Sequence, residues 1–138
     1  MSPGGYKFMA DWWNAQIQNS GLFDKQGHRR PAYFSFQMLG NLRGKRLPVT
    51  GTTAAIHAFA VQQASATEVV FWNFGSSPAD MALTFPAGRT GRFRLALLNA
   101  ASNRLDTVRF GPAADLDATP LLVHLTAYGV ASAQLGEF

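Results

Sequence analysis

Residues 92–98 read RFRLALL, and this stretch decides the fold class. Three apolar residues, Phe93, Leu95 and Leu97, alternate with polar neighbours that include Arg92 and Arg94. In an extended strand, successive side chains point to opposite faces, so the apolar set shares one face and the arginines share the other. We therefore expect a strand of an antiparallel sheet with a core on one side and water on the other.

Other short segments of strand length flank this one on both sides. Turn residues separate them, and the connections are too short for the crossovers that parallel strands require. The predicted strands are 54–62, 68–74, 80–85, 92–98, 105–110, 121–126 and 130–135. This pattern is typical of an antiparallel sandwich or barrel. We predict a mainly β fold, an antiparallel β-sandwich of seven or eight strands that begins near residue 47.

The chain changes character near residue 45, and a helix is predicted before that point, over residues 32–42. The positions that recur at helical spacing are Tyr33, Phe36 and Leu39 or Gly40. Pro31 suits the first helical turn and Gly44 suits the end of the helix. The basic end of residues 40–46 is expected to interact with the helix dipole, since its spacing is not that of a phosphate-binding loop.

We expect the aromatic stripe of this helix to be buried. The chain then divides into an N-terminal arm with a helix, residues 1–45, and a β-sandwich domain, residues 46–138.

Length and composition limit the classes of protein. The chain has 138 residues, 47% of them hydrophobic and 14% charged, which suits one globular core. A complete (β/α)₈ barrel needs ~250 residues. The sequence has no cysteine, which excludes disulfides, thiolate metal sites and a cysteine nucleophile. A net charge of +4 from scattered arginines does not indicate nucleic-acid binding. No run approaches the ~18 apolar residues of a membrane span, so we expect no membrane partner, and the cellular location is left open.

Residues 10–42 carry a resemblance to a known group of enzymes. They read ADWWNAQIQNSGLFDKQGHRRPAYFSFQMLGNL. The matching positions are Gly21, Leu22, Asp24, Gly27, Arg30, Pro31, Ala32 and Tyr33. This stretch resembles the end of the catalytic barrel in clan A glycoside hydrolases, most of all family 39. Such enzymes continue into a small accessory β-sandwich, and residues 58–60 and 69–74 are similar to its strands. The resemblance implies the C-terminal part of such a protein, from the last barrel strand and helix through the sandwich.

The resemblance also implies a retaining mechanism, in which two glutamates on barrel strands lie ~5 Å apart across the scissile bond. This chain has only Glu68 and Glu137. Glu68 opens a predicted strand of the sandwich and Glu137 lies next to the C-terminus, so neither matches the catalytic motifs. We therefore expect no enzymatic activity from this chain and no cofactor.

Aromatic residues are the candidates for carbohydrate binding, because sugar rings stack on exposed aromatic faces. In the resembled enzymes a Trp on the last barrel strand lines the sugar subsite, which points to Trp12 or Trp13. Trp72 is the third candidate, although its neighbours Phe71 and Phe74 favour a core position for it.

Metal binding has little support in the sequence. The three histidines, His28, His57 and His124, lie on a predicted loop and two different strands, which favours solvated or hydrogen-bonded histidines over a zinc site. Asp115 and Asp117 are close carboxylates that could join a calcium site, yet calcium needs six to eight oxygen ligands, and a solvated turn is the favoured interpretation.

Two functions remain after these exclusions. The first is a noncatalytic accessory module of a glycoside hydrolase-like protein, which braces the missing barrel domain or contacts polysaccharide. The alternative is a stand-alone protein-interaction or self-association domain without sugar binding. Both leave apolar surface on the N-terminal arm, so we expect a homo-oligomer, most simply a two-fold dimer.

Overall fold

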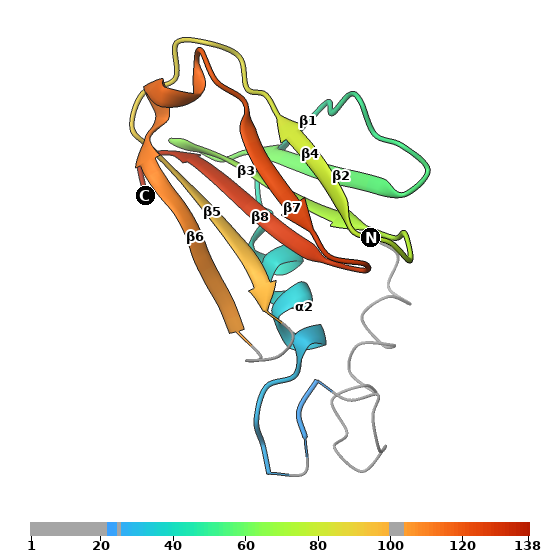
Figure 1. Ribbon diagram of the computed structural model, residues 1–138. Coiled ribbons are helices and arrows are strands. Elements are labelled where there is room, and N and C mark those ends of the chain that lie inside the picture. The colour runs from blue at the N-terminus through green and yellow to red at the C-terminus, as the bar shows by residue number, and fades with distance from the viewer. Residues whose placement is uncertain (1–21, 25, 100–103) are drawn as a thin grey trace.

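The computed structural model describes residues 22–24, 26–99 and 104–138, and its described part is mainly β (Figure 1). Eight strands form antiparallel sheets, with one α-helix on the N-terminal side. The strands are β1 (Lys45–Leu47), β2 (Ile56–Gln62), β3 (Ala66–Asn73), β4 (Ala79–Leu83), β5 (Arg92–Asn99), β6 (Arg104–Pro112), β7 (Leu121–Leu125) and β8 (Val130–Gly136). The helices are α2 (Pro31–Asn41) and the 3₁₀ turn η1 (Ala113–Leu116). The predicted fold class is confirmed.

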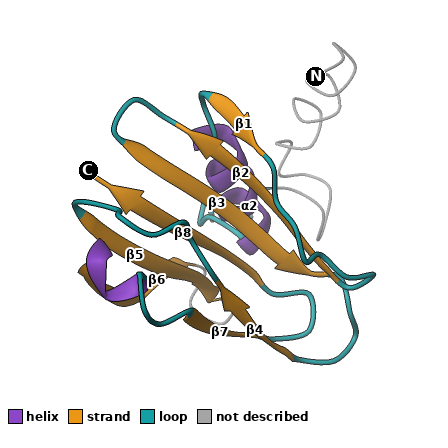
Figure 2. Cartoon of the chain, turned by 90° about the horizontal axis from the view of Figure 1, so that it is seen from above, coloured by secondary structure: helices purple, strands orange, loops and turns teal. Residues whose placement is uncertain are grey.

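The large sheet has six strands in the order β1-β2-β3-β8-β5-β6, and β4 and β7 pair into a second, small sheet. Every pair of neighbouring strands is antiparallel. The small sheet lies across one face of the large sheet, and α2 lies against the opposite face (Figures 1 and 2). We call the face next to the small sheet the inner face and the face next to α2 the helix face.

The main core fills the space between the two sheets. Its members come from the inner face of the large sheet, from η1 and from β7. They are Ala60, Val69, Phe71, Phe93, Leu95, Leu116, Leu121, Val123, Leu125, Ala131, Ala133 and Leu135. Arg92 and Arg94 are exposed, so the alternation of residues 92–98 predicted the orientation of β5 correctly.

The helix α2 buries Phe34 and Met38 against the sheet. This differs from the predicted stripe, because Tyr33 and Phe36 are only half-buried and Leu39 is 43% exposed. Two neighbouring rows of this helix are apolar, and spacing alone cannot choose between them. In the folded protein the row containing Phe34 and Met38 is the buried one.

The segment after α2 corrects two further expectations. Pro31 occupies the first helical turn as predicted, but the last turn contains no basic residue, because Lys45 and Arg46 belong to β1. Gly44 lies beyond the helix end with φ of +124°, and a Cβ there would lie 2.3 Å from the carbonyl oxygen of Gln62. Gly44 therefore permits β1 to approach β2. The strand β1 was not predicted, because its three residues are too few and too polar to form a recognisable strand pattern. Within the described residues, no helix has the length and apolar character needed to cross a membrane.

Candidate functional site

An aromatic cluster lies on the helix face, at the end of β3. His57 of β2 is the register partner of Trp72 of β3, and their rings stack with centroids 6.0 Å apart and planes at 15°. The ring of Phe74 meets His57 edge-on at 5.3 Å and Trp72 edge-on at 6.0 Å. Because residues 72 and 74 are two apart, both point to the same side. We call these three residues the aromatic cluster.

The aromatic cluster is only partly covered. Phe74 is 62% exposed, and Trp72 is half-buried. The indole Nε1 of Trp72 is itself buried and has no hydrogen-bond partner among the residues that the structure describes. Tyr128, 67% exposed in the turn between β7 and β8, lies at the same end, since its N–H donates to the carbonyl of Gly75 at 3.3 Å. Exposed aromatic side chains gathered in one place are typical of an interaction surface.

Asn73 fixes the backbone beneath this cluster. Its side chain is buried, at 1% exposure, and uses both ends of the amide. Oδ1 accepts a hydrogen bond from the N–H of Gly75 at 2.8 Å. Nδ2 donates to the carbonyls of Ser77 at 2.8 Å and Thr126 at 3.1 Å. One side chain therefore joins the β3–β4 turn to the β7–β8 turn and holds both in place.

The candidate sugar-binding residues are placed as follows. Trp72 lies on the helix face, outside the main core, and its neighbour Phe71 points inward with 0% exposure. Trp12 and Trp13 lie outside the described residues. The structure adds His57, which sequence reasoning did not connect with Trp72. The connecting signal, a cross-strand pair, depends on strand register and is not visible along the chain.

The histidines do not converge. His28 Nδ1 lies 3.0 Å from Asp24 Oδ2, and His124 Nδ1 lies 2.7 Å from Asp80 Oδ1, so each has its own carboxylate. In the described ranges, no three metal-ligating side chains gather in one place.

The two candidate calcium ligands lie at η1. Asp115 is exposed in its first turn. Asp117 accepts the N–H of Gly88, which lies 3.1 Å from each of its carboxylate oxygens. This contact gives Asp117 a structural role as the anchor of the loop before β5.

Asp24 and Gly27 shape the loop before α2. Asp24 Oδ1 accepts hydrogen bonds from the N–H groups of Gln26 at 2.9 Å and His28 at 2.8 Å, and Gly27 has φ of +82°. Burial acts to raise the pKa of Asp24, but the hydrogen bonds from His28 and Gln26 outweigh it, and the pKa is lowered.

Glu68 lies within β3, as predicted for a residue of the sandwich. Burial raises the pKa of its carboxyl group, and the charge of Arg94 and a 3.1 Å hydrogen bond from Gln63 oppose this effect only in part. Its carboxylate is thus a half-buried group inside a sheet.

The fold described above, a two-sheet sandwich with a helix on its outer face, is shared with part of several solved glycoside hydrolase structures. The chain matches the crystal structure of a family 30 endoxylanase from Clostridium papyrosolvens C71 with a TM-score of 0.66 and 16% identity, covering 86% of this chain and 31% of that chain. It matches a monomeric β-xylosidase from Caulobacter crescentus CB15 with a TM-score of 0.64 and 13% identity, covering 86% and 33%. For the family 39 enzyme of Xanthomonas axonopodis pv. citri, the TM-score is 0.60 and the identity 15%, covering 86% and 32%.

The chain therefore spans about a third of the length of these solved structures. At this level of identity the match shows a shared fold, and it confirms the resemblance predicted from residues 10–42. No family model matches the sequence, and no curated protein matches it.

Proposed function

We propose that the chain is a noncatalytic accessory β-sandwich of a glycoside hydrolase-like protein, and that its helix face braces a barrel domain. The observation that carries this proposal is the incomplete cover of that face. Phe74 at the end of β3 is 62% exposed, and Leu39 on α2 is 43% exposed. Burial of apolar surface contributes a free energy of ~25 cal/mol per Å², so burial of these side chains would stabilise the contact with a neighbouring domain.

The size of the structural relatives supports a missing neighbour. Each contains roughly twice as much further chain as the part that this protein matches, since this protein covers 31–33% of their length. A domain that folds beside a larger one keeps a contact face that stays partly apolar when it stands alone. The aromatic cluster and α2 form such a face.

The coding sequence that precedes this chain provides the test. We expect it to encode, in frame, the earlier strands of a (β/α)₈ barrel, and we expect that barrel, produced together with this chain as two polypeptides, to copurify with it. Phe74→Ser and Leu39→Ser should weaken the association about tenfold or more. Leu122→Ser on β7, where the side chain is 66% exposed on the small sheet, is the matched control and should have no effect. The proposal would be overturned if no barrel is encoded upstream, or if Phe74→Ser and Leu39→Ser copurify with the barrel as well as the unmodified chain does.

The noncatalytic part of the proposal predicts that the isolated chain does not hydrolyse aryl xylosides, glucosides or arabinosides. Hydrolysis with retention requires two carboxyl groups ~5 Å apart, which are glutamates in the resembled enzymes, and the only two glutamates of the sequence are Glu68 in β3 and Glu137 after β8. The measurement is release of the aryl group at high protein concentration. Turnover that disappears in Glu68→Gln would contradict the prediction.

Contact with polysaccharide is a second candidate function, supported by the exposed ring of Phe74 beside Trp72. Aromatic rings offer the flat apolar surface on which sugars stack. Electrophoresis through a gel that contains xylan tests it, and retardation that is lost in Phe74→Ala would support it. Equal mobility with and without xylan leaves bracing as the function of this face.

A further inference from the structure

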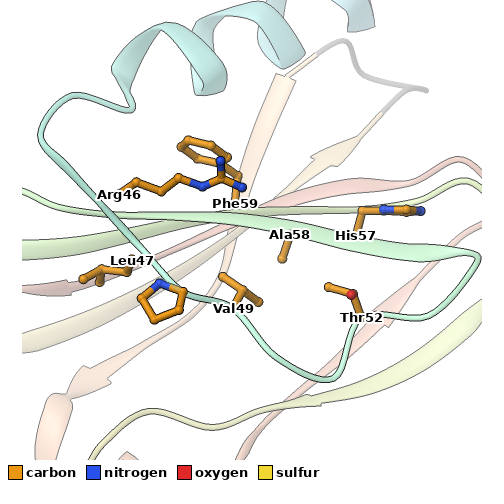
Figure 3. Close-up of a pocket in the computed structure, with 8 residues that line it drawn as sticks. Arg46, Leu47, Val49, Thr52, His57, Ala58 and Phe59 are labelled. Carbon is orange, nitrogen blue, oxygen red and sulfur yellow. The ribbon is translucent and has the colours of Figure 1, made fainter.

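A groove of about 510 Å³ runs along the outer edge of β2, at the point where β1 ends (Figure 3). Three consecutive residues of β2, His57, Ala58 and Phe59, line it. Since the side chains of a strand alternate between its faces, a groove that touches three in a row follows the main-chain edge. Figure 3 shows this arrangement, with Phe59 on one side of β2 and Ala58 on the other.

The main chain of β2 is only partly paired along this edge. The three residues of β1 pair with residues 60–62. Pro48 comes next and lacks an N–H. At the other end, Thr53 satisfies both main-chain groups of Ile56: its N–H donates to the Ile56 carbonyl at 3.0 Å, and its Oγ1 accepts the Ile56 N–H at 2.9 Å. Ala58, between these two ends, is left without a neighbour on this edge.

The hydrogen-bond pattern shows which way the main-chain groups of Ala58 point. On the β3 side, the N–H of Gln63 donates to the Ala66 carbonyl and the N–H of Phe74 donates to the Ala55 carbonyl. Odd-numbered residues of β2 therefore face β3, and even-numbered residues face the groove. The N–H and C=O of Ala58 both point outward, and no described residue is recorded as pairing with either.

The groove also carries a positive charge. Arg46 belongs to its lining, which contains no carboxylate. The guanidinium of Arg46 stacks over the ring of Phe59, 4.8 Å from its centroid, and no described residue forms a hydrogen bond or ion pair with its N–H groups, which can therefore bind an anion. The sequence has no acidic residue between Asp24 and Glu68, and Lys45 adds a further positive charge next to Arg46.

We propose that this groove binds an extended acidic polypeptide segment, which adds to the open edge of β2. One residue of the segment accepts the N–H of Ala58 with its C=O and donates its own N–H to the C=O of Ala58, and a neighbouring carboxylate binds Arg46. A donor and an acceptor from one residue, spaced as in a strand, match the main chain of another strand, and this is how edge strands capture peptides. The volume is within the ~300–1,000 Å³ range of ligand sites.

Fluorescence anisotropy with a short labelled peptide of alternating valine and glutamate tests this site. We expect saturable binding, and a loss of about tenfold or more when glutamine replaces glutamate in the peptide. Arg46→Gln should cause a similar loss. The matched control is Arg109→Gln, an exposed arginine on β6, which should bind as the unmodified protein does.

Ala58→Pro separates main-chain pairing from charge. Proline removes the outward N–H of Ala58 without breaking a bond to β3, and strands tolerate proline where the N–H faces an open edge. We expect this variant to fold and to lose the peptide.

Amide hydrogen exchange of the unmodified protein gives an independent readout in case the proline variant does not fold. Protection of the Ala58 amide on addition of the peptide supports the site. Unchanged exchange, equal binding of the glutamine peptide, or displacement of the peptide by xylan oligosaccharides would overturn it.

Discussion

At the scale of single residues, Asn73 has the clearest structural role. It is one of two buried polar residues in the described part of the chain, the other being Thr67. Its three hydrogen bonds all go to main-chain groups of turns, which have no strand partner of their own. The buried amide of Asn73 forms hydrogen bonds with main-chain groups beyond the ends of the strands, where no neighbouring strand can pair with them. It thereby holds the turns next to Trp72 and Phe74.

Asn73→Ala should lower the free energy of unfolding by about 2 kcal/mol, because the N–H of Gly75 and the carbonyl of Ser77 lose their Asn73 partner and the carbonyl of Thr126 keeps only the N–H of Gly129. Urea denaturation followed by tryptophan fluorescence measures this loss. Asn41→Ala, at the exposed end of α2, is the control and should change stability by less than about 0.5 kcal/mol. Equal stability of the two variants would mean that water replaces the Asn73 amide without cost.

At the scale of elements, α2 shows that the docked side of a helix is chosen by its partner. Phe34 and Met38 are four residues apart and lie on one side, and both are buried. The neighbouring row keeps Leu39 largely in solvent. In the proposed function this outer row is the part of α2 that a barrel would cover.

Met38→Ala should destabilise the fold by about 3 kcal/mol, since Met38 is 2% exposed and its removal leaves a cavity against the sheet. Leu39→Ala, one position along, should cost less than about 1 kcal/mol in the isolated chain because Leu39 is 43% exposed. Thermal denaturation of both variants checks the difference. The reverse order of stability would place the docked row of α2 where the sequence spacing predicts it.

The strand β3 carries an ionisable group whose environment favours the neutral form. Glu68 has a raised pKa in the folded protein, so the folded state retains this proton at a pH where the unfolded chain has lost it. Its contribution to stability is therefore favourable at low pH. It is lost as pH rises from the ordinary value of 4.5 through the raised value.

Glu68→Gln keeps an acceptor for Gln63 and removes the ionisation. We expect the variant to be more stable than the unmodified protein at pH 7, and the difference to shrink at about pH 4, where Glu68 is largely protonated. Urea denaturation across this pH range gives both curves. Glu137→Gln, exposed after β8, serves as the control, and a difference that grows toward acid would contradict the raised pKa.

At the scale of the whole molecule, the described residues cover the two faces of the large sheet to different extents. The small sheet and η1 close the inner face over the main core. The helix face has α2 and the aromatic cluster, with Phe74 in solvent. This asymmetry is an argument for the proposed bracing of a barrel domain.

Self-association is the prediction that belongs to this scale. Without a partner domain, apolar surface on the N-terminal arm and the helix face should pair between copies, most simply as a two-fold dimer. Sedimentation velocity over a concentration series measures it, and the double change Trp12→Ala and Trp13→Ala should dissociate the dimer. A single monomeric species at tens of micromolar, with the tryptophan amides protected from exchange, would rule the dimer out.

The sequence by itself determined the fold class, seven of the eight strands in the described part of the chain, and the helix α2. These features depend on local rules: side-chain alternation in β5 and the proline in the first turn of α2. The family resemblance, carried by residues 10–42, was also visible along the chain, and the fold comparison confirms it.

Only the tertiary structure decided which row of α2 docks, that Gly44 serves the approach of β1 to β2, and that His57 stacks on Trp72. It also decided that the edge of β2 stays open at Ala58. Each of these depends on pairing between segments distant in sequence, and several registers satisfy the same local pattern. Packing against the rest of the molecule selects one register, because only that register buries the apolar side chains and also pairs the main-chain groups.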